Sequence, residues 1–224
     1  MSTTSRFTLR PTVAPRLPSS APAYDASMLD NANNILRLYF AQLDNFTQSL
    51  MASNGGKFVS FPYGAFQDTT TQTALANTAT AMKLNTTDYA NEVYISGGTK
   101  IRVNNAGIYN LQWSAQFQNT DNTTHDASVW LRQGNDGGTS VDIVGSTGLI
   151  GLSPRKTAID YFHSINGWNY VVSLNVDDFI EIYWSTDSTS VTIEAYPAST
   201  APTRPSTASV VATLSFVSAL PATQ

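Results

Sequence analysis

Residues 108–117 read IYNLQWSAQF, a run in which apolar and polar side chains alternate from Tyr109 onward. Successive side chains of a β-strand point to opposite faces of a sheet, so one face of this strand is apolar and the other consists of amides and hydroxyls. The side chains expected in the core are Leu111, Trp113, Ala115 and Phe117. Such a strand is typical of an antiparallel sheet that buries one face.

The sequence from residue 58 onward continues with this period of two, in short runs separated by Gly, Asn, Asp and Pro. No helical periodicity interrupts it, which argues against parallel βαβ folds and favours an antiparallel sandwich with Greek-key connections. The chain is therefore predicted to be mainly β, with a head domain over 58–224. The expected strands are 58–66, 73–82, 91–95, 99–104, 106–119, 126–133, 140–151, 156–165, 168–176, 178–186, 190–196 and 207–218.

Two of these strands are predicted to form a hairpin. Residues 171–185 read VVSLNVDDFIEIYWS, with an apolar run on either side of Asp177 and Asp178. Asp is a favoured turn residue, so we expect the two runs to pair across it.

A single helix is predicted ahead of the strands, over residues 25–54. Asp25 or Ser27 can cap its first turn, and the run Asn54-Gly55-Gly56 is a stop signal. Apolar residues recur inside it at alternating spacings of three and four, the pattern of a coiled-coil seam. We expect a trimer interface at Leu29, Leu36, Tyr39, Leu43, Phe46 and Leu50, with Ala32 completing the seam. The alternative is an ordinary amphipathic helix that packs on its own domain.

The first 24 residues form a separate arm that is rich in Pro and Arg. Prolines at 11, 15, 18 and 22 exclude a helix and favour an extended, polyproline-like course. The arm carries three arginines and no acid, a charge of +3, whereas the remaining nine basic and sixteen acidic residues give −7. We expect the arm to anchor the protein to another molecule, the alternative being that it lies along its own body. The anchoring residues would be Arg6, Phe7, Leu9, Arg10, Val13, Arg16 and Leu17.

Composition excludes several classes of function. The chain has no cysteine, so disulfides, thiolate metal sites and thiol catalysis are excluded. The net charge of −4 comes without a basic surface for nucleic acid, and no apolar run is long enough for membrane insertion. Only 12 % of the residues are charged, which suits a protein whose faces are largely covered by neighbours.

Catalytic patterns are missing from the sequence, and we predict a protein that is not an enzyme and has no cofactor or metal. His125 and His163 lack ligand spacing; we expect His125 in solvent and His163 in an interface or the core. No G-x-S-x-G elbow occurs. Glycan cleavage by paired carboxylates is a remote alternative, since Glu92, Glu181 and Glu194 are the only glutamates. Three aromatic residues could stack on a sugar, although burial is the favoured role: Trp168, Tyr170 and Trp184.

Four segments resemble the C1q and tumour-necrosis-factor-like jelly roll as it occurs in tailed-phage virion proteins. They are 106–109 (AGIY), 127–132 (ASVWLR), 172–184 and 209–216. The resemblance covers about 58–220. The helical stretch 33–45 (NNILRLYFAQLDN) looks like segments of small structural proteins of marine and cyanobacterial phages.

This resemblance implies a homotrimer with jelly-roll heads outward and N-termini gathered at the virion. The chain has no collagen-like stalk or long shaft, so the implied role is a capsid decoration (cement) protein that is made in the host cytoplasm and binds other virion proteins. The alternative is a tail fibre or spike head that recognises a host-surface glycan or protein through loops such as 119–127 or 134–140.

Overall fold

The computed structural model describes residues 12–19, 23–51, 61–135, 137–138 and 140–220. The chain divides into two compact units, Met1–Ser60 and Phe61–Gln224. The first unit contains the helix, and all strands belong to the second. The stretch predicted to stop the helix, Asn54-Gly55-Gly56, lies outside the described residues.

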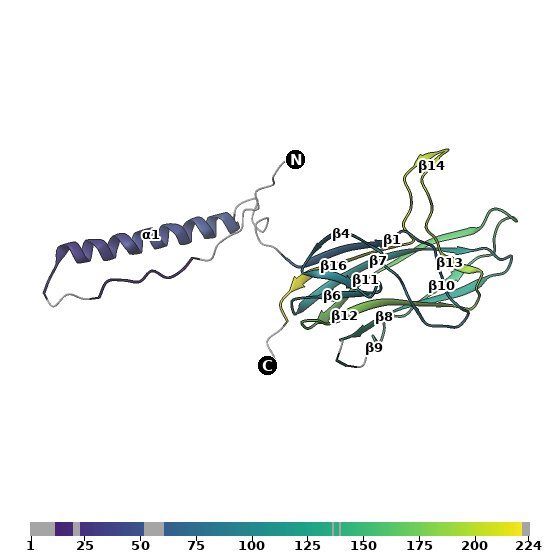
Figure 1. Cartoon of the computed structure of the whole chain (residues 1–224), viewed down its shortest axis with the longest axis horizontal. Helices are drawn as coiled ribbons and strands as arrows, with labels where there is room; N and C mark the ends of the chain where they lie inside the picture. The colour runs from purple at the N-terminus through teal and green to yellow at the C-terminus, as the bar shows by residue number, and fades with distance from the viewer. Residues whose placement is uncertain (1–11, 20–22, 52–60, 136, 139, 221–224) are drawn as a thin grey trace. The chain divides into compact units, whose positions relative to one another are not determined.

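The helix α1 spans Ala26–Met51 (Figure 1). Oδ1 of Asp25 accepts hydrogen bonds from the backbone amides of Ser27 at 2.9 Å and Met28 at 3.4 Å. These bonds satisfy amides that have no partner within the helix. Hydrogen bonds from Ser27, chiefly that of its hydroxyl, lower the pKa of Asp25. Asp25 is therefore the N-terminal cap.

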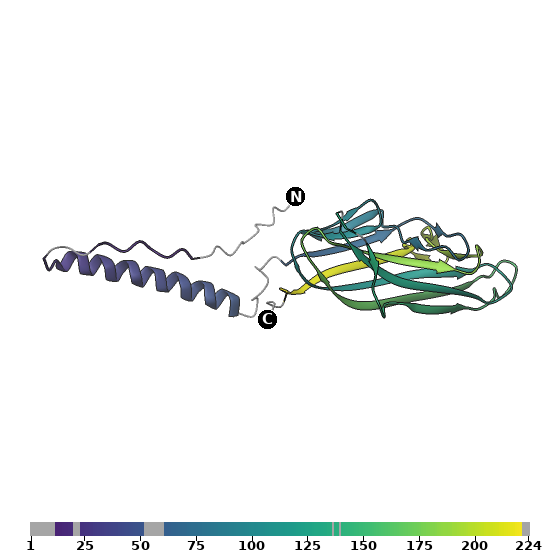
Figure 2. The same cartoon turned by 90° about the horizontal axis from the view of Figure 1, so that it is seen from below.

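The described part of the arm, residues 12–19, is extended, as its prolines predict. Its half-buried residues, Thr12, Pro15 and Pro18, recur at every third position, which is the repeat of a polyproline II helix. Both views show this segment running alongside α1 (Figure 1 and Figure 2).

The second unit consists of two sheets in which all strand pairs are antiparallel. In sheet A the strand order is β2-β13-β7-β16-β1-β4, in which β13 and β16 pair with successive stretches of β7. The strand β11 pairs with β7 along its whole length. Its strands are β1 (Tyr63–Asp68), β2 (Gln72–Thr73), β4 (Thr86–Asn91), β7 (Gly107–Asn119), β11 (Phe162–Leu174), β13 (Val191–Ile193) and β16 (Val210–Ser218).

Sheet B has the order β10-β8-β12-β6-β5, with β3 beside β12 and β9 beside β8. Its strands are β3 (Thr80–Ala81), β5 (Val93–Ser96), β6 (Lys100–Val103), β8 (His125–Gly134), β9 (Val141–Asp142), β10 (Gly148–Leu152) and β12 (Phe179–Thr186). A small hairpin of β14 (Ser199–Thr200) and β15 (Thr203–Arg204) projects from the sandwich in Figure 1. The unit is an antiparallel jelly-roll sandwich, so the predicted fold class is confirmed.

The core lies between the sheets, and β7 supplies its centre. The alternating residues Leu111, Trp113, Ala115 and Phe117 are all buried, at most 7 % exposed. Across the core Phe117 meets Trp184 of sheet B edge to face, with ring centroids 6.0 Å apart. Truncating such an aromatic residue to alanine costs about 3–5 kcal/mol, so this pair fixes how the sheets stack.

Several predicted strands differ in extent. Residues 73–82 form only the end of β2 and the short β3, with a turn between them where Asn77 has φ +55°. The segment 140–151 divides into β9 and β10. The strand β4 was not predicted, because its residues TTDYAN are exposed or half-buried throughout and leave no alternating pattern.

The break predicted between 165 and 168 is absent, and β11 runs through Gly167 without interruption. A Cβ at this position would lie 2.5 Å from the carbonyl oxygen of Trp113. The glycine therefore allows β7 and β11 to approach closely and does not form a turn.

The predicted hairpin at 171–185 is wrong. The first run lies in β11 and pairs with β7 in sheet A, whereas the second is β12 in sheet B. The turn between them passes from one sheet to the other, with Asp177 at φ +65° and Oδ2 of Asp178 accepting from the amide of Asn175 at 2.8 Å. Each run places its alternate side chains in the same core, whether the two strands are hydrogen-bonded neighbours in one sheet or lie in opposite sheets. The sequence pattern therefore could not distinguish the two arrangements.

The start of β1 and the end of β16 lie at the same end of the head. The backbone amide of Phe216 donates to the carbonyl of Pro62 at 2.9 Å. We call the opposite end, where β7 ends at Asn119 and β11 begins at Phe162, the distal end.

Candidate functional site

The outward side chains of β11, β7 and β16 form the centre of one broad surface, which we call the sheet A face. Because the strands are in register, these side chains stand in rows across the sheet. The rows are Val171, Asn110 and Ser215; Asn169, Gln112 and Thr213; and Gly167, Ser114 and Val211.

The sheet A face has no formal charge at its centre. The strands β7, β11 and β16 have 13, 13 and 9 residues and contain no Asp, Glu, Lys or Arg. The 12 % share of charged residues in the whole chain would place about four among them. Two valines on this face are open to solvent, Val171 at 58 % and Val211 at 41 %. Depletion of charge at the centre of a surface patch is typical of interfaces between proteins.

A second apolar surface follows the open edge of the sandwich, where β10 and β11 are the edge strands. We call it the β10–β11 edge; its exposed apolar side chains are Leu149 and Trp168, at 81 % and 44 %. The Trp168 ring crosses from sheet A to cover Gly148 of sheet B, where an added Cβ would lie 2.8 Å from the ring. Exposed edge strands without charges tend to associate, and natural proteins protect or use them.

The outer face of sheet B is different, since it contains paired charges on aromatic rings. The guanidinium of Arg132 lies 3.9 Å from the ring centre of Tyr183 and contacts both carboxylate oxygens of Asp142, at 2.8 and 3.2 Å. This bond is the main reason why the pKa of Asp142 is lowered. The ammonium of Lys100 lies 4.3 Å from the ring centre of Phe179. These groups satisfy one another within a single chain.

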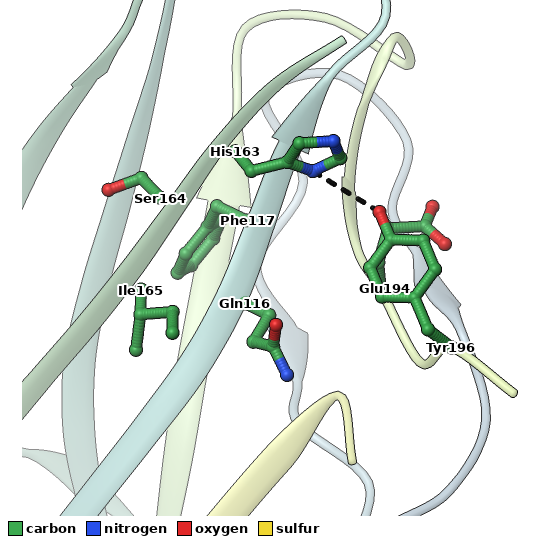
Figure 3. A pocket seen from close by; sticks show the side chains of 7 residues that line it. All are labelled: Gln116, Phe117, His163, Ser164, Ile165, Glu194 and Tyr196. Atoms are coloured by element: carbon green, nitrogen blue, oxygen red, sulfur yellow. Dashed lines mark hydrogen bonds between the residues drawn. The ribbon is translucent and has the colours of Figure 1, made fainter. Parts of the chain in front are cut away.

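A pocket of about 230 Å³ opens at the distal end of the sheet A face (Figure 3). Its walls come from three segments that are far apart in the sequence: 116–117 of β7, 163–165 of β11, and Glu194 and Tyr196, which follow β13. Strand pairing places the first two together, because Gln116 faces Ile165 and Gln118 faces His163.

A chain of hydrogen bonds holds the imidazole at the rim of this pocket. Nε2 of Gln118 donates to Oη of Tyr196 at 2.7 Å, and that oxygen lies 3.2 Å from Nδ1 of His163 (Figure 3). Burial, and then the charge of Glu194, raises the pKa of Tyr196 to about 12. The phenol is therefore protonated at neutral pH, and the tautomer of His163 decides whether it donates to Nδ1 or accepts from it.

The carboxylate of Glu194 forms the acidic side of the pocket. The Thr71 hydroxyl donates to Oε2 at 2.9 Å and the Thr192 hydroxyl to Oε1 at 2.6 Å. Its backbone amide donates to the carbonyl of Gln116 at 2.8 Å. Each carboxylate oxygen keeps further acceptor capacity, because an ionised carboxylate has about four acceptor sites.

His125 is not free in solvent, which corrects the prediction. Its Nε2 lies 3.0 Å from Oδ2 of Asp121 and its Nδ1 lies 3.1 Å from Oδ1 of Asp187, with the side chain 15 % exposed. The bond from His125 is the main cause that lowers the pKa of Asp121. We call this arrangement the His125 clasp; it fastens the loop before β8 to the turn after β12.

The predicted trimer-interface residues lie on α1. Leu36, Tyr39, Leu43 and Phe46 are half-buried, while Leu29 is 48 % exposed. Leu50 belongs to the helix, but its side chain lies outside what the structure describes. Two further apolar side chains are more exposed, Leu38 at 55 % and Phe40 at 56 %. The interface stays a prediction.

The predicted anchoring residues are only partly described. Arg6, Phe7, Leu9 and Arg10 lie outside the described residues. Val13 is 81 % exposed, Leu17 is 48 % exposed and Arg16 is exposed. Anchoring also stays a prediction.

Other candidates from the sequence lie apart. Glu92 accepts from Asn104 at 2.8 Å, and the nearly buried Glu181 accepts from Thr99 at 2.6 Å. Trp184 is fully buried, as favoured, whereas Trp168 is at the open edge. Sequence reasoning did not find the pocket, since its hydrogen bonds join residues 33 and 78 positions apart.

Over the described ranges, no set of three or more His, Asp or Glu side chains is arranged to hold a metal ion. In that same part of the chain, no helix is both long enough and apolar enough to cross a membrane.

Comparisons with known proteins give a likeness in structure alone. No family model matches the chain. No curated protein matches its sequence. Among solved structures, the tumour necrosis factor Eiger of S. frugiperda is similar over 73 % of this chain and 98 % of its own, with a TM-score of 0.47 and 11 % identity. The jelly-roll assignment itself rests on the strand order of the two sheets.

Proposed function

We propose that the protein is a homotrimeric structural protein of a phage virion, a capsid decoration protein that its N-terminal arm anchors to the particle. The observation that carries the trimer is the uncharged sheet A face. A face with no Asp, Glu, Lys or Arg in three adjacent strands loses no hydrated charge when a second copy covers it.

The two apolar surfaces differ in shape and position, and this supports a ring of copies. The sheet A face spans three neighbouring strands, while the β10–β11 edge presents the exposed side chains of Leu149 and Trp168. If the β10–β11 edge of one copy packs on the sheet A face of the next, two different surfaces are in contact, which makes the contact heterologous. Such contacts form a closed ring when the repeated rotation from copy to copy leads back to the first copy. Three copies would then cover one another's exposed edges.

The stem supports the same association. Most of the stability of a helix in a protein comes from packing of its apolar face, so the 26-residue α1 gains stability when that face is covered. The exposed Leu29 and Phe40 extend the apolar side of α1 on one flank of its half-buried residues, and the exposed Leu38 lies on the other flank. Neighbouring helices of a trimer would cover this apolar side.

The virion assignment is supported by the sequence resemblance and by the arm. A basic, proline-rich segment with exposed Val13 and Leu17 suits attachment to an acidic neighbour. Three linked arms strengthen one another, because the first that docks raises the effective concentration of the others.

The first test measures mass and copy number. Light scattering should give three times 24.2 kDa for the purified protein, and purified virions should contain hundreds of copies. A monomeric mass would overturn the trimer, and a few dozen copies would place the protein at the tail.

The second test separates anchoring from folding. Replacing Arg6, Arg10 and Arg16 by Ala should leave trimers free in solution, whereas replacing Lys83, Arg155 and Lys156 removes the same charge from the head and should leave them bound. If the arm variant stays on particles, the arm is not the anchor.

A second candidate function is a tail fibre or spike head that recognises a host-surface glycan or protein. The distal pocket favours it, because the pocket lies at the end of the head opposite the start of β1 and the end of β16. Copy number separates this role from decoration.

A further inference from the structure

We propose that the distal pocket binds one residue of a neutral saccharide. The inference needs neither the trimer nor the virion, because every residue that lines the pocket comes from one copy of the chain.

The first argument is the size of the pocket. Its volume of about 230 Å³ is below the range of roughly 300–1,000 Å³ typical of sites for drug-sized ligands. Space of this size accommodates a single sugar ring and excludes a folded peptide or a nucleotide.

The second argument is the mixture of polar groups. Glu194 and the amide oxygen of Gln116 offer acceptors, and the imidazole of His163 offers a ring nitrogen (Figure 3). The Gln116 amide nitrogen donates to the carbonyl of Ala208 at 2.8 Å, which fixes which end of the amide faces the pocket. Sugar hydroxyl groups both donate and accept hydrogen bonds, so they can pair with carboxylate and amide oxygens and with a ring nitrogen.

The third argument is charge and apolar area. The carboxylate of Glu194 disfavours an anion, which argues against phosphorylated, sulfated and acidic sugars. The side chain of Ile165 is 72 % exposed and also lines the pocket. It gives the carbon–hydrogen face of a neutral ring an apolar contact.

The supporting network is in place without a ligand. The Gln118–Tyr196–His163 hydrogen bonds hold the imidazole, and Thr71 and Thr192 hold the carboxylate. Such preorganisation reduces the entropy lost on binding.

The test uses the full chain and its two histidines. Their imidazole resonances are recorded by NMR while glucose, galactose, mannose or N-acetylglucosamine is added to tens of millimolar, with glucuronate as the charged comparison. A His163→Ala variant assigns the two signals. We expect at least one neutral sugar to shift the His163 signal with a millimolar Kd while the His125 signal stays in place.

Two matched variants complete the test. Gln116→Ala should weaken binding by at least about tenfold. Gln133→Ala should not, although it also removes an amide hydrogen bond to a backbone carbonyl, that of Ser173 at 2.8 Å. The proposal is overturned if no neutral sugar shifts the His163 signal, if glucuronate binds more tightly, or if both variants weaken binding equally. Light scattering on the same samples reports the trimer independently.

Discussion

The two outer faces of the sandwich share one core and differ in how they treat charge. Sheet B pairs its charges on its own surface, as Arg132 does with Asp142 and Tyr183. The centre of the sheet A face has no charged residues and leaves Val171 and Val211 open. A face in permanent contact with water gains solubility from charges. The difference is what the proposed trimer expects, with sheet B in solvent and the sheet A face against another copy.

The largest effect on the oligomeric mass is expected from a charge placed on the sheet A face. Val211→Lys should convert trimers to monomers, because an ammonium buried without a counter-ion costs about 3–5 kcal/mol at each interface. Sedimentation velocity measures the outcome. The matched control is Val141→Lys on sheet B, where the valine is 59 % exposed; it should leave the mass unchanged. Equal behaviour of the two variants would contradict the assignment of the faces.

A change on sheet B should affect the stability of the head and leave its mass alone. Arg132→Ala removes the contacts to Asp142 and Tyr183, which together should lower the free energy of unfolding by about 1–2 kcal/mol after allowance for solvent screening. Urea denaturation measures this. Arg132→Lys keeps the charge but not the planar fork, so it should recover only part of the loss. If either variant dissociates the trimer, sheet B also takes part in association.

Acid should destabilise sheet B and the distal loops without acting on the sheet A face directly. Hydrogen bonds lower the folded-state pKa of Asp121 and Asp142 below the ordinary 3.8. Their contribution to stability is therefore present above pH 3.8 and is lost as the pH falls through the lowered values. The melting temperature should fall in this window, and Asp142→Asn should make that fall shallower.

The smallest effect concerns the distal pocket. Two of the ten tyrosines should titrate late: Tyr196, with its pKa raised to about 12, and the buried Tyr109, whose pKa is raised by burial. Tyr196→Phe should make the late step of the ultraviolet titration smaller and cost about 1 kcal/mol, since it breaks the bonds to Gln118 and His163. A late step of unchanged size would contradict the assignment of Tyr196.

The alternation at 108–117 was sufficient to predict the central strand and its core side chains, because a sheet with one buried face leaves that pattern in any context. The same reasoning was wrong at 171–185. Alternation of apolar and polar residues shows which side chains are buried but not which strand lies next to which. A turn that passes from one sheet to the other was therefore predicted to be a hairpin. The predicted strand break at Gly167 was wrong for a related reason, since close strand packing and turns both favour glycine.

The candidate sites were harder to predict. The absence of charge was visible in the composition, but assigning it to one face required the register that places Gln112 between Asn169 and Thr213. The His125 clasp shows the same limit. Asp121 is four residues from His125, whereas Asp187 reaches it only through the fold.

The hydrogen bond between Phe216 and Pro62 holds the end of β16 beside the start of β1, at one end of the head. A foreign peptide inserted into the β14–β15 hairpin, at residues 201–202, would interrupt neither of the two main sheets. The head is therefore suited to carry an inserted peptide at this hairpin.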